Sequence, residues 1–246
     1  TLLLTGWEGA ICVAMASPVL FLFASIGGSV FGARDDAPRR GHTLPAVLLF
    51  PFVLSPLENR IPEPERRIET VTTIDIDATP AAVWPLVASV DTIRPEEQRA
   101  ALFLAIGFPR PVAATLSHAG AGGVRVATFE GGLRFTETVT AWEPGRRLRF
   151  TIRANGDSIP PTTLDAHVRM GGRYFDVLTG EYQLVPLDGG RRTRLVLRSE
   201  HRLNTHFNPY AAWWSDRIMQ SIQGSIQQVH KQRAERGTRD MRAAHR

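Results

Sequence analysis

The alternating residues between 122 and 203 constrain the fold more than any other feature of this chain. Apolar and polar residues alternate there in short segments, and glycine-rich turns separate the segments. A period of two residues is typical of half-buried β-strands, and paired glycines favour hairpins. An antiparallel run of this length curls and needs a cover over one face. We expect six strands, at 122–132, 133–145, 146–156, 162–170, 173–187 and 191–203.

The segments on either side of this run predict one more strand and three helices. Residues 69–78 alternate as a strand, and Thr79 then serves as N-cap for a helix with Pro80 at its first position. A second helix is expected over 94–107, closed by a glycine. A long amphipathic helix is expected over 208–235. Its apolar stripe recurs at three- and four-residue spacing and consists of Ala211, Trp214, Ile218, Ile222, Ile226 and Val229.

This order of elements resembles the helix-grip fold of the START-like (SRPBCC) superfamily and its polyketide cyclase/dehydrase-type members. The motifs that carry the resemblance are DATPAAVWPLVASVD, TVTAWEPGRRLRFTI, GEYQLVPLDGGRRTRLVL and the tryptophan-containing last helix. The resemblance covers 69–235. It implies an α+β fold in which a curved antiparallel sheet of about seven strands wraps a long C-terminal helix around an apolar cavity. It implies no particular reaction, because one scaffold hosts binders, cyclases and chaperone co-factors.

Strand alternation supplies the expected lining of that cavity. Glu137 shares a strand face with Phe135, and His201 shares one with Leu197. We therefore interpret Glu137 and His201 as inward-pointing ionisable groups and as the candidates for a general base. The expected ligand-cavity residues are Leu133, Phe135, Glu137, Val139, Phe150, Leu197, Ser199, His201, Trp214, Ile218 and Ile222.

Structural alternatives stand beside this interpretation. A β-bulge would flip the alternation around Glu137. Glu137 would also fit near the cavity mouth, paired with Arg125 or Arg153. His201 lies near a strand end, where water is close. Aromatic side chains dominate ordinary cores, so a core role is the simpler interpretation of Trp84, Phe129, Trp213 and Trp214.

The sequence predicts neither a cofactor nor a metal site. Three histidines, His167, His201 and His206, have no carboxylate or cysteine at ligand spacing, and Cys12 is the single cysteine. No G-x-S-x-G motif is present. The net charge of +5 and the pI of about 10.3 come almost entirely from arginine. Since no stacking aromatics alternate with the strand arginines, they favour a solvated outer face over a nucleic-acid surface.

Residues 9–32 contain no charged residue, and a run of this length is typical of a membrane span. Residues 43–57 are apolar but short, which fits a second span, a re-entrant piece or an interfacial segment. Three arginines in the loop between them balance three in the linker that follows, so the positive-inside rule assigns no side. The arginine-rich composition is typical of a GC-rich bacterial genome, and we expect attachment to the bacterial inner membrane.

We divide the chain into membrane segments at 1–58, a linker at 59–68, a START-like domain at 69–235 and a basic tail at 236–246. The tail is expected to be frayed or to lie on an anionic membrane. Because the sequence begins with Thr1 rather than methionine, we expect a fragment of a longer protein. The expected function is membrane-anchored binding of an apolar or amphipathic, lipid-like molecule. The alternatives are a cyclase/dehydratase-type enzyme and an interaction module with a vestigial cavity; no protein partner is indicated.

Overall fold

One antiparallel sheet of seven strands dominates the computed structural model of this protein, which describes residues 17–22, 24–25, 65–98, 100–155, 171–205 and 208–244. Its strands lie in the order β1-β7-β6-β5-β4-β3-β2. The sheet is therefore built from sequential hairpins, except that β1 pairs with β7 instead of with β2. The strands are β1 (Glu65–Ile76), β2 (Pro111–Leu116), β3 (Val124–Phe129), β4 (Arg134–Glu143), β5 (Arg147–Ala154), β6 (Phe175–Leu187) and β7 (Arg192–Asn204).

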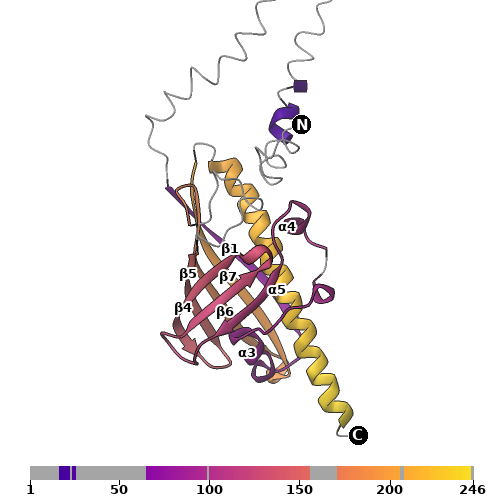
Figure 1. Cartoon of the computed structure of the whole chain (residues 1–246). Helices are drawn as coiled ribbons and strands as arrows, with labels where there is room; N and C mark the ends of the chain where they lie inside the picture. The colour runs from indigo at the N-terminus through magenta and orange to yellow at the C-terminus, as the bar shows by residue number, and fades with distance from the viewer. Residues whose placement is uncertain are drawn as a thin grey trace, which may run out of the picture.

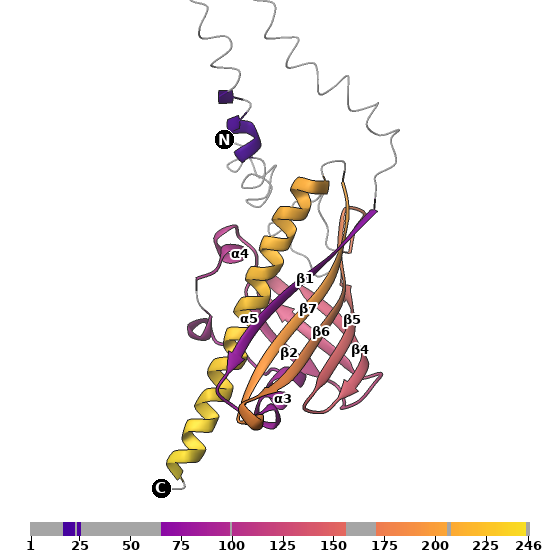
Figure 2. The same cartoon turned by 180° about the vertical axis from the view of Figure 1, so that it is seen from behind.

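A single long helix, α5 (Asn208–Ala244), lies along the concave face of this curved sheet (Figures 1 and 2). Its last turns extend beyond the strands. A short helix, α3 (Pro80–Ala88), closes the sheet near the hairpin of β6 and β7. The Thr79 side chain caps α3 by accepting from the Ala82 N–H at 3.3 Å, as the sequence predicts. This arrangement is the expected helix-grip fold.

Besides a small cluster of Val90, Ile93, Ala114 and Val229, the core of the described residues contains two large apolar clusters along α5. One lies beneath α3 and contains Val83, Val87 and Leu148. The other lies beside α4 (Leu102–Ala105) and contains Phe103 and Ile222. Burial of such side chains from both layers is what holds a sheet to its covering helix.

Strand β4 contributes Phe135 and Val139 to different large clusters, and a β-bulge follows Val139. The register between β4 and β5 shifts between Val139 and Ala141. Residues before the shift keep the predicted alternation, so Glu137 stays on the inner face. After the shift, Trp142 packs against the first cluster and meets Trp84 edge-to-face at 5.0 Å. The bulge therefore reverses the alternation beyond Val139 and leaves Glu137 on the inner face.

The number and the boundaries of the predicted elements differ from the structure in several places. The helix predicted over 94–107 is wrong for most of its length, because it contains only a 3₁₀ turn, η1 (Pro95–Glu97), and one turn of helix, α4. Strand β2 was not predicted, and the strand predicted at 162–170 lies outside the described residues. The last helix continues past 235 through most of the predicted tail, and β1 begins at Glu65, inside the predicted linker.

The predicted membrane segments fall largely outside the described residues. Of the stretch 9–32, only 17–22 and 24–25 are described, and they are helical; 43–57 is not described at all. Within the described part of the chain, no helix has both the length and the hydrophobicity needed to cross a bilayer.

Candidate functional site

A cavity of about 130 Å³ lies between the concave face of the sheet and α5. Its wall is almost entirely apolar, with a few polar side chains. Every strand except β1 contributes to it, together with α5 and the segment before β2. The lining residues are Val90, Ile93, Phe108, Pro111, Ala113, Ala114, Arg125, Ala127, Phe129, Phe135, Glu137, Phe150, Ile152, Val177, Gly180, Tyr182, Leu197, Ser199, Met219, Ile222, Gln223 and Ile226.

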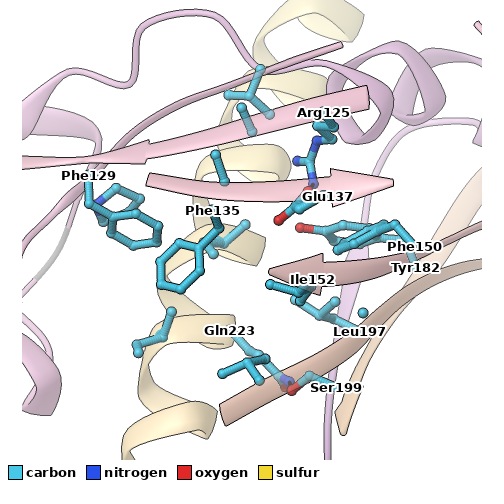
Figure 3. A pocket seen from close by; sticks show the side chains of 18 of the residues that line it. Arg125, Phe129, Phe135, Glu137, Phe150, Ile152, Tyr182, Leu197, Ser199 and Gln223 are labelled. Carbon is cyan, nitrogen blue, oxygen red and sulfur yellow. Dashed lines mark hydrogen bonds and ion pairs between the residues drawn. The ribbon is translucent and has the colours of Figure 1, made fainter. Parts of the chain in front are cut away.

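Three phenylalanines form one side of this cavity. Phe108 and Phe129 meet edge-to-face with ring centroids 6.1 Å apart, and Phe129 meets Phe135 in the same way at 5.4 Å. Edge-to-face pairs place the positive rim of one ring against the negative face of the next. Figure 3 shows Phe129 and Phe135 facing the open space of the cavity. This side therefore offers aromatic faces and edges to whatever enters.

A buried ion pair lies in the same cavity wall. Arg125 on β3 and Glu137 on β4 occupy directly paired positions, and Arg125 Nη1 donates to Glu137 Oε2 at 2.6 Å. They are only 3% and 7% exposed. Burial raises the pKa of the Glu137 carboxyl, and the adjacent arginine opposes that rise. We treat the pair as ionised at neutral pH, because such a short N–O distance is typical of a charge-assisted hydrogen bond.

Aromatic rings surround the arginine of this pair. The guanidinium carbon lies 5.4 Å from the Phe150 ring centroid and 5.8 Å from that of Tyr182, both within cation–π range. Figure 3 shows the Tyr182 hydroxyl beside the Glu137 carboxylate, and we call these residues the Arg125–Glu137–Tyr182 cluster. Burial raises the pKa of the Tyr182 phenol, which therefore keeps its proton at neutral pH.

Behind Tyr182 lies a fully buried histidine of α5. The His230 ring meets the Tyr182 ring edge-to-face at 5.7 Å. Among the described residues, neither ring nitrogen of His230 has a hydrogen-bond partner. Burial, reinforced by the positive charges of Arg125 and Arg233, lowers the pKa of His230 to about 3. The ring is therefore neutral at neutral pH and adds no charge near the cluster.

A polar seam on the opposite side of the cavity fastens α5 to β1 and β7. The Gln223 side-chain amide donates to Ser199 Oγ at 2.6 Å, and its oxygen accepts from Thr72 Oγ1 at 2.8 Å. One turn later, Gln227 donates to the carbonyl oxygens of Thr72 and Leu195. These bonds satisfy buried amides and fix the rotation of α5 about its own axis. Figure 3 shows Gln223 and Ser199 together, away from the Arg125–Glu137–Tyr182 cluster.

The segment between α3 and β2 closes the cavity near α5, where Val90 and Ile93 contribute to the lining. Glu97, at the end of η1, accepts from Arg233 at 2.7 and 2.9 Å and from Arg236 at 2.9 Å. The hydrogen bond from Arg233, aided by the other contacts, lowers the pKa of Glu97 from 4.5 to about 2. This clamp ties the covering segment to the last third of α5.

A glycine on β6 makes room for the ring of Phe150. Gly180 pairs with Phe150 across the sheet, and a Cβ atom built on Gly180 would lie 2.5 Å from the ring atom Cε2. Both residues line the cavity. Any side chain at 180 would therefore displace the ring on which Arg125 rests, and with it the wall of the cavity.

Part of the predicted site lies where the sequence places it. Glu137 lines the cavity in company with apolar residues of β4, β5, β7 and α5. The predicted cavity residues that line it are Phe135, Glu137, Phe150, Leu197, Ser199 and Ile222.

Three predicted strand residues do not line the cavity. Leu133 precedes β4 and is buried against the Phe103 cluster. Val139 lies at the β4 bulge and packs into the cluster under α3. His201 is buried next to the start of α5, where its Nε2 lies 3.0 Å from Ser215 Oγ. His201 therefore does not line this cavity and is not a candidate general base in it.

Two predicted helix residues are also displaced, because α5 is rotated from the predicted stripe. Its sheet-facing side carries Ser215, Met219 and Gln223, so polar residues occupy part of the buried face. Trp214 stacks edge-to-face on its exposed neighbour Trp213, and Ile218 is only half-buried. A prediction from apolar periodicity alone therefore assigns the buried face of this helix about one residue away from its observed position.

The prediction missed Tyr182, Gln223 and His230 and named Arg125 only as a possible partner. The sequence could have identified Tyr182, because it lies on a strand in which apolar and polar residues alternate. Gln223 and His230 were overlooked because glutamine and histidine are rarely assigned to a core. Among the described residues, no group of three His, Cys, Asp or Glu side chains is placed to hold a metal ion.

Comparisons with protein families, curated proteins and solved structures indicate what this chain is similar to. Residues 67–230 match the family described as polyketide cyclase / dehydrase and lipid transport. A search of curated proteins found no match. Among solved structures, the Zhui aromatase/cyclase from Streptomyces sp. R1128 is 16% identical, with 70% of this chain and 96% of that one covered and a TM-score of 0.41. An uncharacterised protein from Rhizobium leguminosarum is 13% identical, with 70% and 99% covered and a TM-score of 0.39.

Proposed function

The chain belongs to the polyketide cyclase / dehydrase and lipid transport family, and on that premise we propose that its domain binds an apolar small molecule between the sheet and α5. The family and the cavity together suggest a hydrophobic-ligand-binding or cyclase-type domain. The observation that carries binding is the cavity itself, an apolar space with polar side chains at two places in its wall, the Arg125–Glu137–Tyr182 cluster and the pair of Ser199 and Gln223. Apolar burial supplies affinity in such sites, and a few polar groups set orientation.

The open cavity favours ligand sequestration over the two alternatives, a cyclase-type reaction and an interaction module with a vestigial cavity. A vestigial cavity would be filled by side chains, and this one is open. The charges of this pair neutralise each other internally, because Arg125 and Glu137 bind each other, while Arg125 Nε has no hydrogen-bond partner among the described residues. A ligand therefore enters without having to neutralise a lone buried charge, which would be costly.

Two matched variants test this binding function. Ala127 on β3 lines the cavity, so Ala127→Met places a longer apolar side chain inside it. Thr138 is exposed on β4, so Thr138→Met adds a similar side chain outside. Small molecules extracted from the purified full chain are compared by mass spectrometry. We expect one apolar species with the wild type and Thr138→Met, and a loss with Ala127→Met. The same yield from all three proteins would contradict binding in this cavity.

A cyclase-type reaction is the second candidate, and one observation favours it. The Glu137 carboxyl lines the cavity with a pKa raised by burial, and a protonated phenol lies beside it. In such a reaction Glu137 would remove a proton from the carbon next to a carbonyl, while Tyr182 would donate to the carbonyl oxygen. The discriminating variant is Tyr182→Phe. A loss of turnover with unchanged ligand affinity would identify an enzyme, and a change in affinity alone would identify a binder.

We further propose that residues 9–32 attach the protein to the bacterial inner membrane. The support is the uncharged run itself. The test is fractionation of cells that express the full chain, followed by an alkaline carbonate wash. Retention in the membrane pellet supports the anchor, and release into the supernatant contradicts it. Cysteine labelling at an introduced site near residue 60 would then assign the side.

A further inference from the structure

The size, charge and aromatic lining of the cavity narrow the class of ligand. Resting on the proposed binding function, we propose that the ligand is a neutral molecule of single-ring size that carries one hydroxyl or amino group. The ring would lie against Phe129 and Phe135, and its polar group would face the Arg125–Glu137–Tyr182 cluster.

Volume sets the size. The cavity measures about 130 Å³. An enclosed apolar cavity of about 150 Å³ accepts benzene, whereas pockets for drug-sized ligands occupy about 300–1,000 Å³. A single ring therefore fills this space, and a second fused ring or a long acyl chain would have to extend out through the open side of the cavity or displace its walls. The walls are built from close-packed side chains of the three core clusters, which resist displacement.

The charges in the cavity wall determine which ionisation state of a ligand the cavity favours. Among the described lining residues, Arg125 and Glu137 are the charged ones, and they neutralise each other at 2.6 Å. An anionic ligand would meet the Glu137 carboxylate, and a cationic one would meet the Arg125 guanidinium. In either case a net charge would be added to a buried wall whose two charges already neutralise each other. The cavity therefore selects a neutral molecule over a carboxylate.

The Arg125–Glu137–Tyr182 cluster sets the polar group. Glu137 accepts from Arg125 through Oε2, and both oxygens of a carboxylate can accept hydrogen bonds. Figure 3 shows the Glu137 carboxylate and the Tyr182 hydroxyl at the cavity wall. A ligand O–H or N–H can donate to that carboxylate, and a hydroxyl can also accept from the phenol. A hydrocarbon would cover these groups without replacing their hydrogen bonds, which is costly.

The aromatic wall sets the shape. Phe108, Phe129 and Phe135 continue edge-to-face from ring to ring. A flat ring next to Phe135 would extend this series and gain contacts that a saturated ring does not make. The proposed ligand class is therefore phenol-like, and p-cresol is a suitable probe.

The test uses the wild-type full chain and probes that each change one property. Binding is measured by isothermal titration calorimetry against a protein-free reference in the same buffer. The probes are p-cresol, toluene without the hydroxyl, p-toluate with a negative charge, and 2-naphthol with a second fused ring. We expect p-cresol to bind and each of the other three to bind at least about ten-fold more weakly, the effect of one hydrogen bond to a charged group.

Each outcome decides a separate point. If 2-naphthol binds as tightly as p-cresol and displaces it, the single-ring size is wrong while the proposed binding function stands. If toluene matches p-cresol, the polar group has no role, and if p-toluate matches it, the charge argument fails. If none of the four binds, but a long-chain fatty alcohol does, the ligand class is overturned and binding remains. If the fatty alcohol also fails to bind, the proposed function itself fails.

Discussion

Arg125 Nη1 and Glu137 Oε2 lie 2.6 Å apart at directly paired positions of β3 and β4, and both side chains are buried in the cavity wall. Strand alternation places Glu137 on the inner face of the sheet, and Arg125 on the neighbouring strand supplies the opposite charge at the paired position. The pair keeps a carboxylate beside a ligand space without leaving its charge uncompensated. Its two members are therefore energetically coupled, which a double-mutant cycle measures.

Removal of one partner from this pair is expected to harm folding strongly. Glu137→Gln leaves a buried arginine without its counter-charge, and we expect a loss of roughly 3–5 kcal/mol in the free energy of unfolding. The double variant Arg125→Met with Glu137→Leu removes both charges and is expected to lose less than either single variant. Urea unfolding of the wild type, Arg125→Met, Glu137→Leu and the double variant completes the cycle that checks this. Additive losses would show that the two residues do not depend on each other.

The clamp at Glu97 predicts a specific acid sensitivity. In the folded protein the pKa of Glu97 is about 2, below its ordinary value of 4.5. The unfolded chain therefore binds more protons as the pH falls through 4.5, and the stability that Glu97 contributes is lost between about pH 4.5 and 2. Glu97→Gln should be less stable at neutral pH and should change less across that window. Glu96→Gln, at the exposed neighbouring position, is the matched control and should follow the wild type.

His230 predicts a second pH dependence, at higher pH. Its pKa in the folded protein is about 3, below the ordinary 6.5, because burial disfavours the charged ring. The unfolded chain takes up this proton first, so stability falls as the pH drops from about 6.5 toward 3. His230→Leu removes that slope and also removes two buried nitrogens that lack partners among the described residues. We expect equal or higher stability at pH 7. A variant that is much less stable and keeps the slope would contradict this account.

The rotation of α5 predicts an order for two isoleucines. Ile222 is buried against the sheet, whereas Ile218, one turn earlier, is half-buried. We expect Ile222→Ala to cost about 2–4 kcal/mol of unfolding free energy and Ile218→Ala less than half as much. Thermal or urea unfolding measures both. Equal losses at both positions would fit the stripe that the sequence predicts, and a larger loss at Ile218 would contradict the observed rotation of α5.

The sequence predicted the architecture well because hydrophobic period and turn residues are local. Thr79 and Pro80 mark the start of α3, and the glycines at 189–190 lie between β6 and β7, as expected. The same rules placed Glu137 correctly, since the β4 bulge comes after it. They failed over 94–107, where Phe103 packs into the large cluster beside α4 and Glu97 accepts from Arg233.

The rest of the site depends on contacts between residues far apart in the chain. The rotation of α5 follows from hydrogen bonds of Gln223 and Gln227 to residues of β1 and β7 that lie 24 to 155 residues away in the chain. Tyr182 becomes part of the site only because β6 and β3 curve toward the same cavity. No local pattern records these pairings, so a single sequence predicts the strands and not the cluster.

The most direct test of the central claim is the thermal shift produced by p-cresol in the wild type and in the cavity-filling variant Ala127→Met. A ligand that binds only the folded state stabilises it by about 2.7 kcal/mol at 100 times its Kd. The account predicts a rise in Tm for the wild type and for Thr138→Met, and no rise for Ala127→Met, although that variant folds. An equal rise in all three proteins would place binding outside the cavity between the sheet and α5 and would contradict the account.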